Sequence, residues 1–465
     1  MTRTRLVALV HRRPSPAALA LTLLRGGVAV AALGAPALSA QPTGRPHAGP
    51  TRDPITSVAV VVRLARDTAP ASRVARSSAR IAAHAADLAA TPLLPFVSLD
   101  ASALRQTLNL AAFGFPGPSA ASDPFSVYSA GIRVQQALLD PAAWRRWRAQ
   151  RDSAGAAAGD AEAGRDGIAT LAASRYFQLL ATEAALDGRL ADSALAQAVL
   201  IEVAARRRVG EVTDIDLTRA RLGVTAAAAR LTDARAARAQ ARLELGLAIG
   251  IGTDGVPEVR DSLRSPASVP DAIDTMTAMA VRDLVARRPD VVAGTARRRA
   301  ADGAVRARQL EYLPRISAFG EYQAIGVTAG TLPAVYRVGV QASIPLVDGL
   351  SRRHRGGLDA ERMRIATALA DEVTLRATRE IEGARVELRR ATAALAVADA
   401  QLALAFEELE QARRRVRVGI GGTLETTQGI AAVAAARDQV IGGRLRYHLA
   451  RLEWHRATAT LDALH

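Results

Sequence analysis

One segment matches a pattern that holds phosphate groups. Gly250, Gly252 and Gly255 follow the GxGxxG spacing of dinucleotide-binding loops, whose backbone N–H groups lie against a pyrophosphate. Such a loop follows a strand and opens a helix, whereas this segment follows the helical stretch Thr213–Ile249. We therefore interpret it as the turn that ends a helix, and we assign no cofactor to it.

Other patterns that carry catalysis or bind metals do not occur in the sequence. HExxH, GxSxG and lysine-bearing P-loop patterns are absent, and the seven histidines lack the spacing of metal ligands. The chain has no cysteine, which excludes disulfides and also the N-terminal lipid anchor that some exported envelope proteins carry. The sequence thus predicts no enzyme, no metal site and no lipid anchor.

The charge of the chain is strongly basic, with a formal net charge of +16, and every basic residue is arginine. A basic balance can indicate nucleic-acid binding. Here, however, the arginines are spread along predicted helix faces without an aromatic-rich module that would stack bases. Scattered charge on long helices is usually a solvated face, so we expect no nucleic-acid partner.

The first 40 residues have the composition of an export signal. Five arginines accompany an apolar stretch from Ala17 to Leu33, and small residues follow at Ala37–Ala40. We expect a signal peptide over residues 1–40 and a mature N-terminal tail over residues 41–54.

Two stretches have the periodicity of very long helices. In the second, alanine and other apolar residues alternate at spacings of four and three from Ala384 to Val416, which is a coiled-coil seam. This helical stretch runs from about Gly349 to Val418, and a similar one runs from about Pro141 to Val209. At 1.5 Å per residue each would extend roughly 105 Å, too long for a globular core.

Shorter helices are predicted beside the long ones. Thr213–Ile249 and Asp271–Glu311, with a break between them, together recover the length of one long helix. Ile55–Ala90 and Thr423–Leu464 form the equivalent pair.

Short segments between the helices alternate with a period of two residues. Apolar and polar side chains alternate in Ile316–Ala324 and Val338–Ile344, and less cleanly in Phe96–Ala101 and Tyr128–Gln136. Alternation with one mostly polar face suits strands with lipid on one side and a water-filled lumen on the other. Four strands cannot close a pore alone, so we expect a homo-oligomer to complete a barrel.

The same order of segments occurs twice along the chain. Tyr128–Asp140 recurs as Tyr336–Asp348 at an offset of 208 residues, and an Arg-Val-Gly turn recurs at an offset of 209. We therefore predict two copies of one structural unit, over residues 55–262 and 263–465.

Four glycines fall inside the first long helix, where each costs up to about 1 kcal/mol relative to alanine. They are Gly155, Gly159, Gly164 and Gly167. Because the offset between the copies is kept on both sides of them, we expect a weakened or kinked helix without an insertion.

With these segments in this order, the chain resembles the TolC-like outer membrane efflux protein family. The residues that carry the likeness are Val209–Leu217, Val418–Glu425, Arg288–Val291, Tyr312–Pro314 and Ile344–Gly349. The resemblance implies a mainly α fold with a small β part. In it, duplicated long coiled-coil helices form a periplasmic α-barrel, and each chain of a homotrimer contributes four strands to a 12-stranded transmembrane β-barrel.

The resemblance also implies a function. It predicts a passive channel in the outer membrane of a Gram-negative-type envelope, extending into the periplasm as the exit duct of a tripartite efflux or type I secretion system. The implied partners are a periplasmic adaptor (membrane fusion) protein, an inner-membrane pump and outer membrane lipid.

Two glycine turns are the implied docking sites. In such proteins these turns lie at periplasmic tips where the adaptor docks, and the matching positions here are Val209, Gly210 and Thr213 with Val418, Gly419 and Thr423. Glycine at these positions also simply permits a helical hairpin to turn, and a docking tip requires both properties.

Relatives narrow the periplasmic entrance with acidic rings, and Glu425 occupies the corresponding place. Three copies of Glu425 would form a ring of carboxylates that favours cations. Gln428, one turn further, stands where a second acid is expected, which predicts a weaker gate. A solvated glutamate on a helix face is the alternative interpretation. Asp214 and Asp216 are candidates for caps of the first return helix.

Two other classes of protein remain open at this point. A soluble periplasmic coiled-coil adaptor would share the hairpin and the signal peptide, and a structural protein of the cell envelope would share the heptads. Neither explains the four alternating strands, so the channel is favoured. The sequence does not identify the exported substrate.

Overall fold

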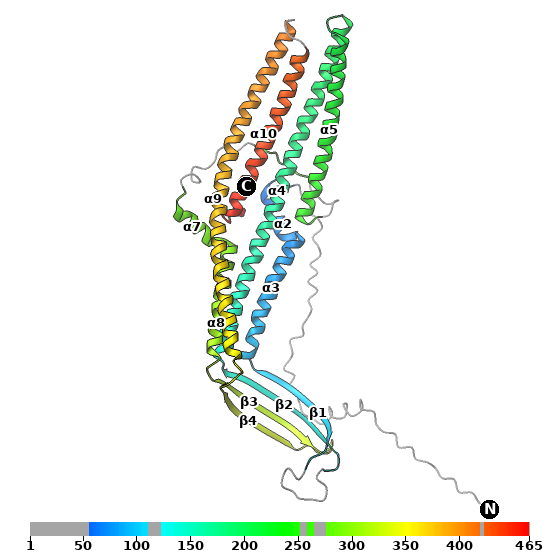
Figure 1. The fold of residues 1–465 in the computed structure, drawn as a ribbon. Coiled ribbons are helices and arrows are strands. Elements are labelled where there is room, and N and C mark those ends of the chain that lie inside the picture. Colours follow the sequence, from blue (N-terminus) through cyan, green and yellow to red (C-terminus); the bar gives the residue numbers. More distant parts are fainter. Residues whose placement is uncertain (1–54, 110–121, 252–257, 265–275, 419–422, 465) are drawn as a thin grey trace, which may run out of the picture. The chain divides into compact units, whose positions relative to one another are not determined.

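The computed structural model describes residues 55–109, 122–251, 258–264, 276–418 and 423–464. The expected signal peptide and tail lie outside these residues. Arg52–His465 forms one compact unit. Its elements (Figure 1) are α2 (Val58–Thr68), α3 (Pro70–Ala90), η1 (Thr91–Leu93), β1 (Phe96–Gln106), β2 (Phe125–Leu139), α4 (Pro141–Arg208), α5 (Asp214–Ile249), α7 (Ala278–Arg287), α8 (Pro289–Leu310), β3 (Arg315–Gly326), β4 (Ala334–Ser343), α9 (Ser351–Arg417), α10 (Thr423–Ala457) and η4 (Leu461–Ala463).

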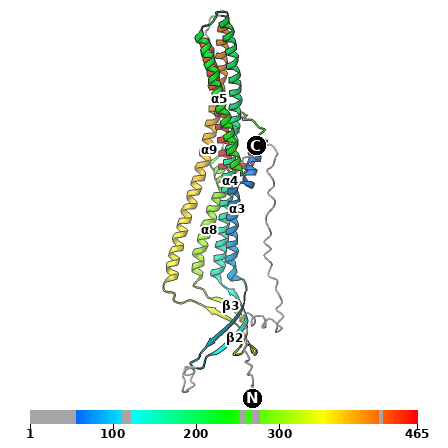
Figure 2. The same cartoon turned by 90° about the vertical axis from the view of Figure 1, so that its right-hand side faces the viewer.

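Two long helices dominate the unit, as the sequence predicts. Helix α4 has 68 residues and α9 has 67, so each extends about 100 Å at 1.5 Å per residue. Helix α5 lies beside α4, and α10 lies beside α9 (Figure 1 and Figure 2). The two helices of each pair pack against each other. None of the described helices has the length and apolar character that crossing a lipid bilayer requires.

Two of the predicted shorter helices are interrupted, which corrects the prediction from sequence. The expected helix Ile55–Ala90 is split at Ala69 into α2 and α3, and the expected helix Asp271–Glu311 is split at Arg288 into α7 and α8. Both residues have extended backbone, with ψ of 132° and 134°. Each precedes a proline, whose ring clashes with a helical conformation of the residue before it. Residues 271–275 lie outside the described part of the chain.

The C-terminal helix is also shorter than the predicted Thr423–Leu464. Helix α10 ends at Ala457, and Ala459 has a left-handed conformation with φ of 55°. Such a residue cannot continue a right-handed helix. The turn allows Leu461 and Leu464 to enter the largest apolar core.

The predicted heptad seam is buried, which confirms the coiled-coil interpretation of α9. Its buried members are Ala384, Leu388, Ala391, Leu395, Ala398, Ala405, Leu409 and Ala412. Two glycines of α10 face this seam. A Cβ atom on Gly429 would lie 3.2 Å from the Cα of Leu409, and one on Gly443 would lie 3.2 Å from the Cδ1 of Leu395. Small residues at the contacts thus let the two helices approach closely.

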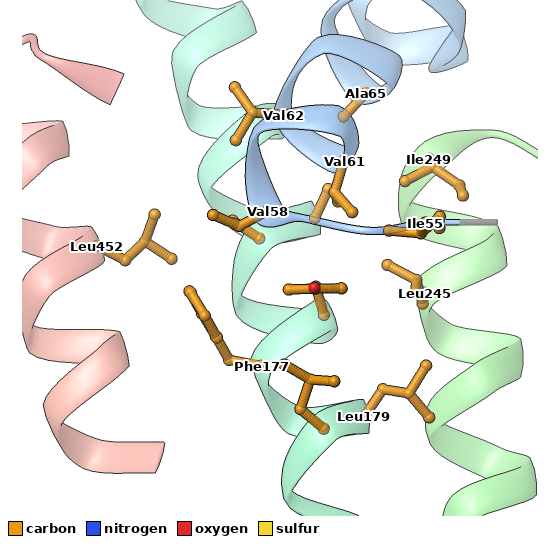
Figure 3. Close-up of a cluster of buried hydrophobic side chains, with 14 of the residues drawn as sticks. Ile55, Val58, Val61, Val62, Ala65, Phe177, Leu179, Leu245, Ile249 and Leu452 are labelled. Carbon is orange, nitrogen blue, oxygen red and sulfur yellow. The ribbon is translucent and has the colours of Figure 1, made fainter. Parts of the chain in front are cut away.

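The largest apolar core forms where α2 meets three other helices. Valines of α2 point toward side chains of α4, α5 and α10 (Figure 3). Fully burying one aliphatic side chain of this size contributes about 1.5–3 kcal/mol. The labelled members are Ile55, Val58, Val61, Val62, Ala65, Phe177, Leu179, Leu245, Ile249 and Leu452.

The glycine-rich segment of α4 is continuous helix, without an insertion, as the offset between the two copies predicts. That this segment is weakened or kinked stays a prediction. A Cβ atom added at Gly155, Gly164 or Gly167 would meet no neighbouring heavy atom within 4 Å. At Gly159, a Cβ would lie 2.9 Å from the Pro289 carbonyl oxygen. This glycine therefore allows the start of α8 to lie against α4.

The four strands form one antiparallel sheet in the order β1-β2-β3-β4. All four predicted strands are present and each is longer than expected, although β4 ends at Ser343 and so excludes Ile344 from the predicted strand. The sheet is a single layer, and most side chains of the edge strands β1 and β4 are exposed. The boundaries 55–262 and 263–465 of the two predicted repeats stay a prediction.

Alanine at two glycine positions of α4 is expected to change stability in opposite directions. Gly155→Ala gains up to about 1 kcal/mol of helix propensity, because nothing lies within 4 Å of its Cβ position. Gly159→Ala forces α8 away from α4, because its Cβ also falls 3.0 Å from the Cβ of Ala293. Thermal unfolding followed by circular dichroism should show a higher midpoint for the first variant and a lower one for the second. Equal shifts would contradict the close packing at Gly159.

Candidate functional site at the sheet faces and hairpin tips

One face of the sheet is mostly apolar across all four strands, with Arg105 and Gln136 as polar residues toward its ends. The register places Leu99, Ile132, Tyr322 and Tyr336 in one row across the sheet. The same face carries Val97, Ala101, Ala103, Ala130, Val134, Ile316, Ala318, Gly320, Ala324, Val338, Val340 and Ala342. Leu99 is 75% and Val338 79% exposed, so a broad apolar surface is uncovered in the described unit.

The opposite face carries charged and polar side chains. Arg133 Nη2 donates to Glu321 Oε1 at 3.3 Å, and Arg337 Nη2 donates to Glu321 Oε2 at 2.5 Å. Arg133 also lies 3.8 Å from the Asp100 carboxylate. Because these residues come from four adjacent strands, they form a band of alternating charge across the sheet. A cavity of about 280 Å³ lies over the part of this face that includes Arg133, Glu321 and Arg337.

The first glycine turn closes the hairpin of α4 and α5 by backbone hydrogen bonds. Gly210 has φ of 81°, a conformation that glycine adopts readily. Its N–H donates to the Arg207 carbonyl at 3.2 Å, and the Glu211 N–H donates to the Arg206 carbonyl at 3.0 Å. This is the Schellman arrangement that satisfies the last carbonyls of a helix. Val209 beside it is 71% exposed.

Side chains hold the other side of the same turn. Thr213 and Asp216 form a capping box at the start of α5, and the Asp216 carboxylate accepts from the Thr213 N–H at 3.1 Å. Arg207 donates two hydrogen bonds to Asp214, at 2.7 and 2.9 Å. These hydrogen bonds and the guanidinium charge lower the pKa of Asp214 below its ordinary value. Asp216 is thus a cap, as the sequence suggests, whereas Asp214 mainly ties the two helices together.

The second turn is described only in part. Val418 is 68% exposed at the end of α9, and Thr423 begins α10. Gly419 and the side chain of Thr423 lie outside the described residues. The Glu425 carboxylate lies 3.7 Å from Arg415 Nε, so an ion pair bridges α10 and α9 near this tip. Gln428 is exposed.

A buried arginine has a role that sequence reasoning missed. Arg288, at the break between α7 and α8, is 5% exposed. It donates to both carboxylate oxygens of Asp290 at 3.0 and 2.7 Å, to Glu380 of α9 at 2.9 Å and to the Ala457 carbonyl at 3.3 Å. Burial acts to raise the pKa of Asp290, but the hydrogen bonds from Arg288 lower it below its ordinary value. The sequence signal was the Arg-Pro-Asp motif, which does not reveal Glu380.

No cluster of at least three histidines, aspartates or glutamates suited to a metal ion occurs among the residues whose positions are described. Gly250 ends α5 with φ of 74° and donates its N–H to the Leu247 carbonyl. This agrees with the interpretation of the glycine pattern as a helix-ending turn. Gly252 and Gly255 lie outside the described residues.

Comparisons with known proteins agree with this architecture. A family model described as "Outer membrane efflux protein" matches residues 280–460. Protein CyaE of Bordetella pertussis is 29% identical over 373 residues, which are 78% of this chain and 75% of that protein.

Solved structures are similar over nearly the whole chain. The Campylobacter jejuni CmeC outer membrane channel matches with a TM-score of 0.76 at 16% identity, over 87% of this chain and 86% of that one. The Vibrio cholerae outer membrane protein VceC matches with a TM-score of 0.75 at 16% identity, over 86% of this chain and 95% of that one. These similarities confirm the predicted fold class, mainly α with a small β part.

Removing the cap at the first tip is expected to loosen α5 locally. Thr213→Ala should destabilise the first turn of α5 by about 1 kcal/mol, because the capping box is lost. Hydrogen–deuterium exchange of the amides in that turn should become several-fold faster. The matched control is Thr225→Ala in the same helix, where the hydroxyl only donates to the Arg221 carbonyl. Equal exchange in both variants would count against a capping role for Thr213.

Proposed function

Because the chain belongs to the TolC-like outer membrane efflux protein family, we propose that it is the passive exit duct of a tripartite efflux or type I secretion system. It is an outer membrane channel that extends into the periplasm, and not an enzyme. The observation that carries the proposal is the sheet register, which separates an apolar face from a charged face across all four strands.

The open edges of the sheet support a homotrimer. In the described sheet, the outer edges of β1 and β4 have no strand partner, and such edges expose unpaired backbone groups. Pairing β4 of one copy with β1 of the next, around a threefold axis, closes twelve strands. The apolar positions from Ile316 to Ala324 run about 27 Å along their strand. At the strand tilt of about 40° in outer membrane barrels this spans about 20 Å of bilayer, somewhat less than the apolar band of about 25 Å in such proteins. The band of Arg133, Glu321 and Arg337 then lines a water-filled lumen.

The hairpin tips are the proposed docking positions for a periplasmic adaptor that leads to an inner-membrane pump. The positions are Val209, Gly210, Thr213, Val418, Gly419 and Thr423. Two features support this. Exposed valines occur at equivalent places of both turns, and each preceding helix ends with three arginines in its last turn. Among the described residues, Arg206, Arg207 and Arg415 already pair with carboxylates of this chain, which leaves Arg208, Arg414 and Arg417 for a partner. Such a surface fits a partner that offers apolar side chains surrounded by carboxylates.

Glu425 and Gln428 are the proposed periplasmic gate. Three copies of Glu425 would place three carboxylates around the entrance and favour cations. The pairing of Glu425 with Arg415 reduces the negative charge that each copy adds, and Gln428 adds none. The gate is therefore weakly selective.

Substitutions at this ion pair are expected to change ion selectivity in opposite directions. Glu425→Gln should lower the cation preference, because it removes the ring of carboxylates. Arg415→Gln should raise it, because it leaves those carboxylates unpaired. Reversal potentials in planar bilayers under a salt gradient measure both effects, and Glu361→Gln at the other end of α9 serves as the control. An unchanged cation preference in both variants would remove Glu425 from the gate, and a protein that gives no conductance at all would contradict the channel itself.

A single cysteine at a tip is expected to crosslink to the adaptor. The chain has no cysteine, so Val209→Cys gives a unique thiol for a cleavable crosslinker in cells that make the whole export system. The adaptor should then co-purify with the channel. Leu222→Cys, at a position 69% exposed further along α5, is the matched control. Docking at the tip is contradicted if both cysteines capture the adaptor equally or if neither does.

A further inference from the structure

Two of the three tryptophans lie in the first turns of α4, each next to an arginine one turn later. The Cζ of Arg148 is 3.9 Å from the ring centroid of Trp144, and the Cζ of Arg151 is 5.4 Å from that of Trp147. Among the described residues, no carboxylate pairs with Arg148 or Arg151. These four residues form a cationic and aromatic surface that we name the tryptophan–arginine stripe.

The stripe faces away from α8. Arg145 and Arg146 of α4 pair with Asp302 and Glu311, at 3.7 and 2.8 Å. At 100° per residue, Trp144 lies about 140° and Arg148 about 100° around the helix from Ala149, which packs against Gly303 of α8. Trp144 is 43% exposed. The charges of the stripe are thus available to a ligand outside this helix pair.

The stripe lies next to the membrane-facing sheet. Helix α4 begins at Pro141, directly after β2 ends at Leu139. Trp144 is then about 5 Å and Arg148 about 10 Å along the helix, and side chains on a helix slope toward its N-terminus. The polar headgroup zone adds about 5–7 Å on each side of the hydrocarbon core. Trp144 and Arg148 therefore fall at the depth of the headgroups that face the periplasm, and Trp147 and Arg151, about 9 and 15 Å along the helix, extend from there toward the periplasm.

Resting on the proposed function, we propose that this stripe binds anionic phospholipid headgroups of the periplasmic leaflet of the outer membrane. Arginine guanidinium groups match phosphate geometry with paired hydrogen bonds. Tryptophan rings favour the membrane interface, where one edge is apolar and the other wet. The second half of the chain has a similar basic start, since Arg353 and Arg355 are exposed in the first turns of α9.

Quenching of tryptophan fluorescence by brominated lipid tests the proposal. The full chain is reconstituted in phosphatidylcholine vesicles that contain increasing fractions of brominated phosphatidylglycerol or brominated phosphatidylcholine. We expect brominated phosphatidylglycerol to quench the tryptophan fluorescence at lower mole fractions than brominated phosphatidylcholine does. The R148Q/R151Q variant should require about fivefold more anionic lipid for each arginine removed. The R148K/R151K variant keeps the two positive charges and should retain a preference for phosphatidylglycerol over phosphatidylcholine.

Arg230→Gln is the matched control, because Arg230 lies on α5 and donates only to the Ala226 carbonyl. Its quenching should equal that of the native chain. Equal quenching by both brominated lipids overturns the proposal. The absence of quenching by either lipid also overturns the proposal. That result is expected if the stripe contacts a second copy of the chain or faces the lumen. Planar-bilayer conductance of the same preparation distinguishes failure of this lipid-binding proposal from failure of the proposed function. A protein that conducts but shows no lipid preference contradicts only the lipid-binding proposal. A protein that never conducts contradicts the proposed exit duct.

Discussion

The four strands form a single layer, and their register decides which side chains lie on each face of the sheet. The surroundings of each face depend on this register. A shift of one residue would move Arg337 to the apolar face and Val338 to the charged face, because side chains alternate along a strand. In the described unit, no second layer covers either face. In the proposed function the apolar face meets lipid, the charged face meets water, and other copies of the chain pair with the open edges. The long helices α4 and α9 begin a few residues after β2 and β4.

Close approach between helices depends on small side chains at a few positions. Leu395 and Leu409 of α9 pack against glycines of α10, and Gly159 of α4 accommodates the start of α8. Glycine is unfavourable in a helix, yet at these positions a Cβ atom would separate two helices. Gly155 has no such neighbour, so its presence has no explanation in the packing of this unit.

Ion pairs also join helices at two places where the chain breaks or turns. Arg288 joins the break between α7 and α8 to Glu380 of α9, and Arg207 joins α4 to Asp214 of α5. The pKa of Asp290 is lowered in the fold. Its pairing with Arg288 therefore stabilises the folded state at pH values above the ordinary pKa of an aspartate. That contribution is lost as the pH falls through the lowered value. At the break between α7 and α8 these contacts lie beside an apolar cluster that includes Val285, Val291 and Ala457, so polar and apolar contacts together hold the helix ends in place.

The sequence by itself determined the long helices, the four strands and their order, because heptad spacing and two-residue alternation are local patterns that report which side is buried. It also placed the turn at Gly210, since few residues other than glycine adopt that backbone conformation readily. Only the tertiary structure decided the partners of charged residues, such as Glu380 for Arg288 and Arg415 for Glu425, because the first pair is brought together by packing between distant segments and the second across a turn. It likewise decided that α4 continues through its four glycines, because a propensity cost of up to about 1 kcal/mol per glycine is too small to break a helix of 68 residues.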